Sequence, residues 1–377
     1  MKVVFFTHAF TSCWNNGNAH FLRGVARELV KLGHSVVVHE PVDGWSRSNA
    51  LHDGGAAVLR DAASLIPGVK LRGYIASPDL DEALHGADLV IVHEWNPPEL
   101  IADIGRRRAQ GATFTLLFHD THHRAVTAPE QLEEFDLGGF DGVLAFGEVL
   151  REIYVRRGWA RRAFTWHEAA DTDLYRPSPE TAKVCDLVWI GNWGDNERSA
   201  ELAEYLIRPV RELGLSARTY GVRYPQDALD ALEAGAIDYR GWLPNHQAPA
   251  AFAKARATIH VPRGPYARQL PGIPTIRMFE ALACGIPLVS APWSDSEALF
   301  PAGCYLGVSS GSTMKSALSA VLGDPELAAS LSQAGLCAVL ERHTCRHRAI
   351  ELLDIVTDIK RPGSPRQPAA QQERIAS

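Results

Sequence analysis

Four ionisable side chains stand close together in the segment FHDTHHR, residues 118–124: His119, Asp120, His122 and His123. They directly follow the apolar stretch TFTLL, and the carboxyl end of a parallel strand is where open α/β sheets bind ligands. Such side chains can exchange protons with a substrate. Two alternatives stay open. The group could bind zinc, although no distant partner ligand is defined, or the histidines could serve the structure by capping a helix or bonding loop carbonyls.

Arginines in the second half of the chain are candidates for binding an anion. Arg263 follows the predicted strand TIHV, and Arg198 and Arg268 are the next candidates. Positive side chains directed at a leaving group stabilise the charge that develops on it. For each arginine, the alternative is an ordinary ion pair with a nearby carboxylate.

A predicted helix that begins near Pro274 adds a second kind of anion site. Proline suits the first turn of a helix, and the free N–H groups of that turn attract phosphate. Gly272 and Thr275 lie beside this start and leave backbone N–H groups open. Glu280 is predicted to face inward on the same helix, where its carboxylate could accept from two hydroxyl groups. The alternative is an ion pair with Arg277, three residues earlier on the same face.

Two short polar loops complete the set of candidate site residues. Gly191 and Asn192 follow the apolar segment DLVWI, and Gly17 lies in a loop of asparagines after the first predicted strand. Glycine permits close approach of the backbone to a ligand. Simple turns at the strand ends would explain both loops equally well.

Alternating strands and helices must position these residues. Short apolar runs predict strands over 3–6, 35–39, 88–93, 113–118 and 142–146, and again over 186–190, 217–220, 237–240, 258–261 and 287–290. Helical periodicity predicts helices over 21–32, 97–109, 147–157, 198–213, 274–283 and 346–359. This alternation is typical of parallel sheets covered by helices. Neither half carries the G-x-G-x-x-G pattern after its first strand, which disfavours a dinucleotide oxidoreductase.

The predicted order divides the chain into two domains of one α/β class. We expect an N-terminal Rossmann-like domain over 1–166, a linker over 167–180 and a C-terminal Rossmann-like domain over 181–345. A helix over 346–360 follows. The tail, 361–377, is rich in Pro, Gln and Ala and is predicted to be disordered.

Composition excludes several classes of protein. A net charge of −6 disfavours a nucleic-acid partner. The six cysteines are scattered without a CxxC pair, which favours a reducing compartment over a disulfide framework. No apolar run approaches the roughly 20 residues that span a bilayer. We therefore expect a cytoplasmic protein with no transmembrane segment.

Several motifs resemble those of a known enzyme group. The segment PTIRMFEALACGIPLVSAPW, residues 274–293, resembles the donor-site signature of GT-B glycosyltransferases of group 1, which are family-4-like enzymes. The resemblance is closest to the CgeB-type spore maturation branch. It extends to DLVWIGNWGDNER at 186–198, YRGWLPN at 239–245, ERHTCRHRAIELL at 341–353 and the linker phrase DTDLYRP at 171–177.

The resemblance implies two facing Rossmann-like domains with parallel sheets and a cleft between them, the GT-B architecture. The first would bind the acceptor and the second a nucleotide-sugar, and the last helix would cross back to the first domain. Glu280 would hold the ribose, and His119 would contact the donor sugar with Asp120 beside it as a base or orienting group. The chain departs from the signature at Gly272, where the first of two glutamates would stand. We expect backbone amides around 271–273 to act in its place.

The resemblance implies a retaining glycosyltransferase that requires neither a metal nor another cofactor. The donor is expected to be a UDP- or GDP-linked sugar. The acceptor is unidentified and could be a small molecule, a glycan or a protein. Two other functions remain open: a nucleotide-sugar-binding protein that has lost activity, and a nucleotide-sugar 2-epimerase.

Overall fold

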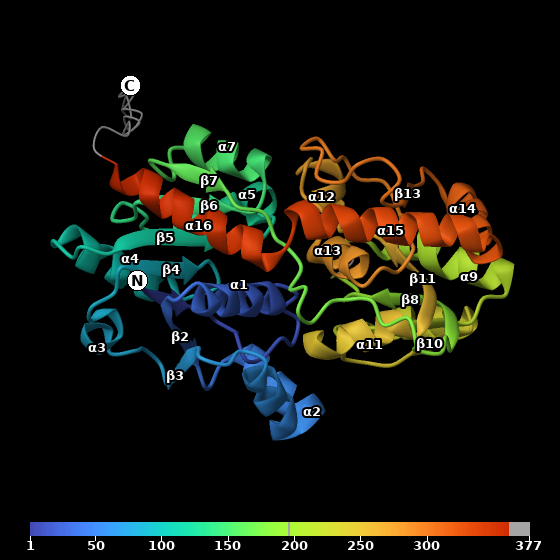
Figure 1. The fold of residues 1–377 in the computed structure, drawn as a ribbon, viewed down its shortest axis with the longest axis horizontal. Helices are drawn as coiled ribbons and strands as arrows, with labels where there is room; N and C mark the ends of the chain where they lie inside the picture. The colour runs from blue at the N-terminus through green and yellow to red at the C-terminus, as the bar shows by residue number, and fades with distance from the viewer. Residues whose placement is uncertain (195–196, 362–377) are drawn as a thin grey trace.

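The computed structural model describes residues 1–194 and 197–361, which form two α/β domains side by side (Figure 1). All strand pairs are parallel. The N-terminal sheet has the order β3-β2-β1-β4-β5-β6-β7. Its strands are β1 (Lys2–Phe6), β2 (Ser35–Pro41), β3 (Lys70–Tyr74), β4 (Leu89–His93), β5 (Thr115–Asp120), β6 (Gly142–Ala145) and β7 (Ala163–Thr165).

The C-terminal sheet repeats this plan with the order β10-β9-β8-β11-β12-β13. Its strands are β8 (Cys185–Ile190), β9 (Ala217–Tyr220), β10 (Ile237–Tyr239), β11 (Ala255–His260), β12 (Leu288–Ser290) and β13 (Leu306–Gly307). The strand order reverses beside β1 in one sheet and beside β8 in the other. Loops that leave such switch points form the ligand crevice of doubly wound sheets. The predicted GT-B arrangement of two facing Rossmann-like domains is confirmed.

Helices cover both sheets. Those of the N-terminal domain are α1 (Ala19–Lys31), α2 (Trp45–Ser64), α3 (Leu80–Leu84), α4 (Pro98–Ala109), α5 (Arg124–Thr127), α6 (Pro129–Glu133) and α7 (Glu148–Arg156). Those of the C-terminal domain are α8 (Ser199–Leu202), η1 (Ala203–Ile207), α9 (Arg208–Leu213), α10 (Gln226–Ala234), η2 (Asn245–Gln247), α11 (Ala248–Ala253), α12 (Gly264–Arg268), α13 (Ile276–Ala283), α14 (Gly311–Gly323) and α15 (Pro325–Arg342). The helix predicted over 198–213 is α8 and α9 joined by the π-helical turn η1.

The chain passes between the domains twice, and the two crossings touch. Residues 166–184 connect β7 to β8, and α16 (Cys345–Lys360) returns from α15 to pack against α1 (Figure 1). A parallel bridge joins Ala170 of the first crossing to Thr344 of the second. Gly24 of α1 makes this contact possible, because a Cβ atom there would lie 2.5 Å from Sγ of Cys345.

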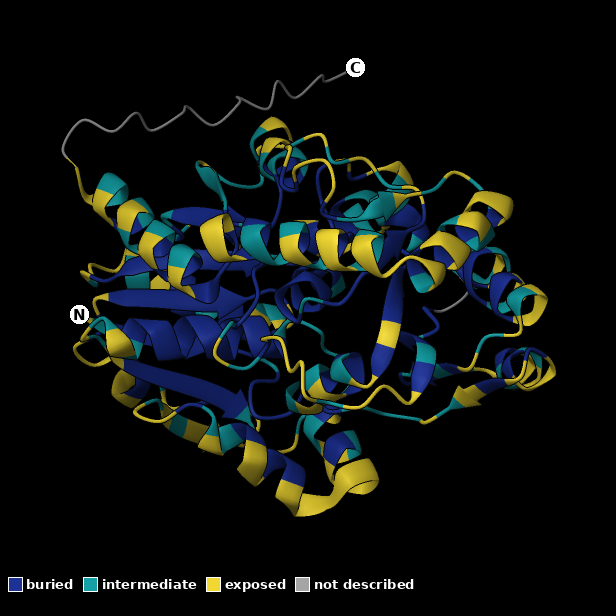
Figure 2. Ribbon diagram, turned by 45° about the vertical axis from the view of Figure 1, so that its right-hand side comes forward, coloured by how far each residue is buried: buried dark blue, intermediate teal, exposed yellow. Residues whose placement is uncertain are grey.

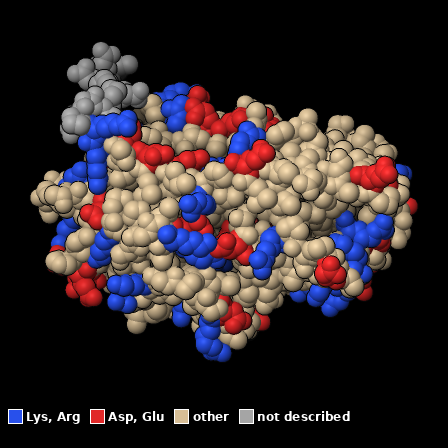
Figure 3. Space-filling view, viewed as in Figure 1, with Lys and Arg blue, Asp and Glu red and all other residues tan. Residues whose placement is uncertain are grey.

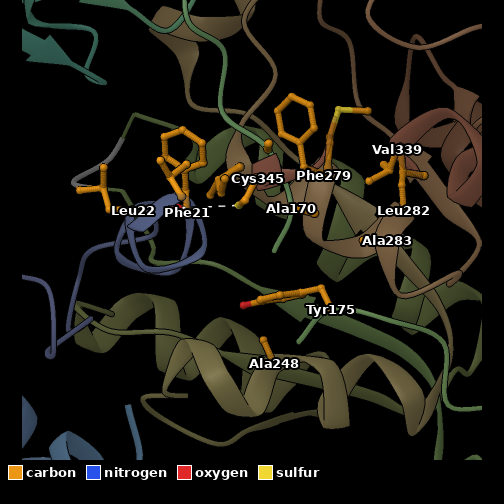
Figure 4. Close-up of a cluster of buried hydrophobic side chains, with 14 of the residues drawn as sticks. Phe21, Leu22, Ala170, Tyr175, Ala248, Phe279, Leu282, Ala283, Val339 and Cys345 are labelled. Carbon is orange, nitrogen blue, oxygen red and sulfur yellow. Dashed lines mark hydrogen bonds between the residues drawn. The ribbon is translucent and has the colours of Figure 1, made fainter. Parts of the chain in front are cut away.

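The buried core continues through this junction (Figure 2). Phe21 and Leu22 of α1 belong to the same apolar cluster as Phe279 and Leu282 of α13, with Ala170 and Cys345 between them (Figure 4). A shared apolar core of this kind resists free motion of one domain against the other.

Several elements of the N-terminal domain were absent from the prediction, among them β3 and α2. β3 is a polar, exposed edge strand, so it lacks an apolar run. α2 is weakly amphipathic, and Gly55 interrupts its helical geometry with a φ of 66°. The predicted disorder of 361–377 concerns residues that, apart from Arg361, lie outside those described. Within the described ranges, no helix is long and apolar enough to cross a membrane.

Candidate active site

A cavity of about 540 Å³ lies between the domains, at the switch points of both sheets. From the N-terminal domain it is lined by the loops after β1, β4 and β5 and by the start of α2. From the C-terminal domain it is lined by the loops after β8, β9, β10 and β11 and by the start of α13. The predicted interdomain cleft is therefore present, and each domain contributes one wall.

The C-terminal wall concentrates positive charge. Its lining includes Arg198, Arg223, Arg263 and Arg277. The lining also includes Thr275, the N-cap residue of α13, whose side chain makes no capping hydrogen bond. The first N–H groups of a helix have no partner within the helix. The arginines and this helix end together form a site suited to phosphate oxygens.

Arg198 is a buried cation held by neutral groups. Its guanidinium donates to the carbonyl of Val261 at 2.7 Å and to that of Asn192, and it lies 5.1 Å from the ring centroid of Trp189. Burial, together with the neighbouring charge of Arg263, lowers the pKa of Arg198 to about 9. An anion in the cavity would stabilise this charge, since a buried ion is unfavourable without an opposite charge.

The other two predicted arginines occupy different environments. Arg263 lines the cavity and has a long contact of 3.4 Å with the carboxylate of Glu197. The same carboxylate lies 3.5 Å from His123, which belongs to the opposite wall. Arg268 is 62% exposed and pairs with Glu201 at 3.1 Å outside the cavity lining. The structure therefore retains Arg263 as a candidate and removes Arg268, which forms the surface ion pair that was its alternative.

The start of α13 differs in detail from the prediction. Gly272 and Pro274 are buried and do not line the cavity, although Thr275 does. The N–H of Gly272 donates to the carbonyl of Ser294 at 2.7 Å, so it is not open to a phosphate. Gly272 has a φ of +87°, and a Cβ atom there would lie 2.4 Å from Oε1 of Glu297. The Glu297 side chain thus fills the space where a side chain at position 272 would begin.

Glu280 lies beneath this wall with its carboxylate fully buried. One oxygen is 2.9 Å from Nδ1 of His20 and accepts from the hydroxyl of Tyr175 at 3.0 Å, while the other accepts from Arg277. Burial alone would raise the pKa of Glu280, but Arg277 and His20 outweigh it and lower the pKa. Glu280 does not line the cavity, whereas Arg277 does. In the structure Glu280 is paired with Arg277 and does not face the cavity, so its geometry does not support the predicted direct contact with ribose hydroxyls.

The two polar loops do meet at the cavity. Asn192 donates to Asn15 across the cleft and accepts from the N–H of Val222 at 3.0 Å. Gly191 lines the cavity. Its N–H donates to the carbonyl of Tyr220 at 2.8 Å, so this N–H is not open to a ligand. Gly17 also lines the cavity, and its carbonyl accepts from Asn245 at 3.2 Å.

The predicted catalytic pair lies in the core rather than in the cleft. β5 runs two residues beyond its expected end, so His119 and Asp120 belong to the strand. His119 is fully buried, its ring lies 4.9 Å from that of Trp166, and burial lowers its pKa to about 3. Asp120 accepts from the hydroxyl of Tyr154 at 2.7 Å, and burial raises its pKa. Neither side chain lines the cavity, so the predicted catalytic contact of His119 and Asp120 with a substrate is wrong.

His122 and His123 of the same segment do line the cavity. Burial lowers the pKa of His122 to about 2, with the charges of His123, Arg263 and Arg124 adding to the effect. A zinc site was one alternative for this segment. Within 1–194 and 197–361, no group of three or more His, Cys, Asp or Glu side chains is placed to hold a metal ion.

Glu168 is a cavity-lining residue that the sequence did not reveal. Its side chain is 4% exposed, and the structure records no hydrogen bond or ion pair to its carboxyl group from the described residues. Burial and then the charge of Glu280 raise its pKa well above the usual range, against the opposing effect of Arg277. Burial therefore favours the protonated carboxyl group, which can both donate and accept a hydrogen bond. It escaped notice because it lies in a linker without periodicity.

Comparisons with known proteins agree with this geometry. Residues 198–354 match a family model described as glycosyl transferase-like. Over 95% of its length the chain also matches the fold of a solved glycosyltransferase. The chain has the GT-B fold, and residues 198–354 are similar to a glycosyl transferase-like family. The sequence has no match among curated proteins.

Three solved structures illustrate the likeness of this GT-B fold to others. Sucrose-phosphate synthase from Thermosynechococcus elongatus is 13% identical with a TM-score of 0.65, over 95% of this chain and 99% of the other. HepE from Anabaena, solved with UDP and glucose, is 13% identical with a TM-score of 0.63, over 95% and 99%. An α-glucosyltransferase bound to UDP and DNA is 12% identical with a TM-score of 0.66, over 94% and 99%. At such identity the likeness establishes the fold.

Proposed function

We propose that this glycosyltransferase moves a sugar from a UDP- or GDP-linked donor to an acceptor hydroxyl in the cleft, with retention at the anomeric carbon and without a metal. The motifs at 171–177, 186–198 and 274–293 favour the CgeB-type branch. The observation that carries the proposal is the C-terminal wall, where arginines surround an uncapped helix start. Two of the similar structures contain UDP, which agrees with a nucleotide on this wall.

The diphosphate is proposed to lie against Thr275 and the first N–H groups of α13, between Arg263 and Arg277. As the bond from the anomeric carbon to the phosphate oxygen breaks, negative charge grows on the diphosphate. Positive side chains and helix N–H groups that are already in place stabilise that charge without reorganising. These groups can perform the work that a metal ion performs in other transferases.

The burial of Glu168 supports a direct transfer. A double displacement requires an ionised carboxylate as nucleophile, and burial raises the pKa of Glu168, which disfavours that form. In the proposed step, the acceptor oxygen bonds to the anomeric carbon on the face that the diphosphate leaves. The acceptor proton passes to the departing phosphate oxygen, so no enzymic nucleophile is needed. Glu168, from its place beside Arg277, is proposed to hydrogen-bond hydroxyl groups of the transferred sugar.

A panel of nucleotides and nucleotide-sugars tests the proposal. The purified protein is heated with UDP, GDP, dTDP and ADP and with their glucose or mannose conjugates, and the unfolding temperature is recorded. Ligands that bind the native state raise this temperature by mass action. We expect UDP or GDP compounds to raise it and the conjugate to be hydrolysed or transferred slowly. Absence of any shift across the panel would refute the nucleotide site.

A further inference from the structure

The N-terminal wall of the cavity differs from the other wall by its lack of formal charge. Its described lining residues, all from the segment 1–166, include no Asp, Glu, Lys or Arg. Tryptophans, asparagines and histidines take their place. Burial and the charge of Arg124 lower the pKa of His8 to about 4, and His122 is likewise held neutral at pH 7.

Trp95 presents a ring that is fixed in position and yet 42% exposed. The guanidinium of Arg124 lies 4.1 Å from its ring centroid and is held by Glu94 at 2.7 Å. The ring of His122 meets that of Trp95 edge-on at 5.1 Å. The indole is therefore supported from behind, and the surface that remains exposed borders the cavity.

Trp45 forms a second platform at the start of α2, where it is 55% exposed. The ring of Trp14 meets it edge-on, with centroids 4.8 Å apart and an interplanar angle of 88°. The indole nitrogen of Trp14 donates to Asp53 at 2.6 Å, which fixes that ring. Exposed indoles that are held rigidly at a cavity are a mark of binding surfaces, because their apolar area is otherwise unfavourable in water.

We propose that the acceptor is an uncharged saccharide whose ring stacks on Trp95 and Trp45. This rests on the proposed function. A pyranose ring has a face of C–H groups that packs against an indole, and a rim of hydroxyl groups that both donate and accept. Asn16 lines the same wall and offers an amide partner for that rim. An indole combines a large apolar face with a polar edge, which suits such a ligand.

The distribution of charge in the cavity favours an uncharged saccharide over a nucleic acid, a sugar phosphate or a lipid. A nucleic acid or a sugar phosphate needs cations beside its phosphate groups, and the arginines of the cavity all lie on the opposite wall. On the face of the molecule seen in Figure 3, acidic and basic side chains are interspersed rather than gathered into a basic stripe. A lipid chain needs a continuous apolar groove, whereas here the indoles alternate with asparagines and imidazoles.

The test compares acceptor classes with the donor found in the nucleotide panel. Release of nucleoside diphosphate above the donor-hydrolysis background is measured with methyl glycosides of neutral hexoses, glucose 6-phosphate, a DNA oligonucleotide and a polyprenyl phosphate. We expect stimulation by methyl glycosides alone. Stimulation only by a phosphate-bearing acceptor, or by the lipid, would overturn the inference.

Matched variants locate the acceptor. Trp95→Ala is expected to raise the KM for the methyl glycoside about ten-fold, and Trp95→Phe, which keeps a ring, to restore most of it. The dissociation constant of the nucleotide, measured without acceptor, is expected to stay unchanged in both variants. An unchanged constant shows that both variants fold. An unchanged KM in Trp95→Ala and Trp45→Ala would refute stacking. Failure of the wild-type protein to bind any nucleotide would instead refute the proposed function.

Discussion

The two walls of the cleft come from domains of the same architecture but offer opposite chemistry. The C-terminal wall carries Arg198, Arg263 and Arg277 around a helix start, and the N-terminal wall carries indole rings, amides and imidazoles. Two parallel sheets with the same kind of switch point can therefore bind different ligands. The ligand is determined by the loops that leave the switch point. The positive charge lies where the leaving group is proposed to depart, and the opposite wall has no Asp, Glu, Lys or Arg among its described lining residues.

The largest expected effect concerns charge on the C-terminal wall. Arg263→Ala removes a cation beside the proposed diphosphate and should lower kcat by about 10² to 10³-fold, the usual loss for one stabilising donor. Steady-state kinetics with the identified donor measure this. Arg268→Ala is the matched control, because Arg268 pairs with Glu201 outside the cavity. Equal losses in both variants would erase the distinction between the two arginines.

The second effect tests whether His119 belongs to the core. Its pKa of about 3 lies below the value near 6.5 of the unfolded chain, so the unfolded state binds the extra proton. Its contribution to stability is present above pH 6.5 and is lost as pH falls toward 3. At pH 4.5 the loss is about 2–3 kcal/mol. Urea unfolding of wild type and His119→Gln between pH 7 and 4.5 measures it, and an identical pH slope in both would contradict the placement.

A third effect concerns Glu168, at the boundary of the two walls. Glu168→Ala should raise the KM for the nucleotide-sugar about ten-fold while leaving the affinity for the free nucleoside diphosphate unchanged. Glu168→Gln keeps a neutral donor and acceptor of the same shape, so it should retain most of the wild-type affinity. If Gln is as damaging as Ala, an ionised carboxylate is required and the direct transfer proposed above is wrong.

The smallest effect concerns a contact between the two walls. Glu197 lies 3.5 Å from His123 and 3.4 Å from Arg263, and its side chain is 27% exposed. Long, partly exposed contacts of this kind contribute about 0–1 kcal/mol. Glu197→Gln should therefore change the free energy of unfolding by less than about 1 kcal/mol, measured by denaturant titration. A much larger loss would mean that this link holds the cleft closed.

Sequence reasoning succeeded where burial imposes a pattern. β1, β4 and β8 are apolar runs covered on both faces, and they were predicted within one or two residues. The two-residue error at the end of β5 had larger consequences, because it moved His119 and Asp120 from a loop into the core. Local patterns do not fix strand ends, which depend on pairing with neighbouring strands.

The site was predicted less well than the fold for a related reason. Trp95 follows the predicted strand at 88–93, so the strand-end rule applied to residues 118–124 would have found it too. Glu168 offered no such signal, because its burial arises from packing between two crossings of the chain. Glu280 was identified as a key residue of α13, but only the structure shows that Arg277 carries its effect into the cavity.

The most direct test of the account is a crystal structure of the protein with the nucleoside diphosphate that binds best. We predict that the diphosphate oxygens lie within hydrogen-bonding distance of Arg263 and of the first N–H groups of α13, with the N-terminal wall left free for an acceptor. A nucleotide bound on the N-terminal wall, or outside the cleft with these arginines unoccupied, would contradict it.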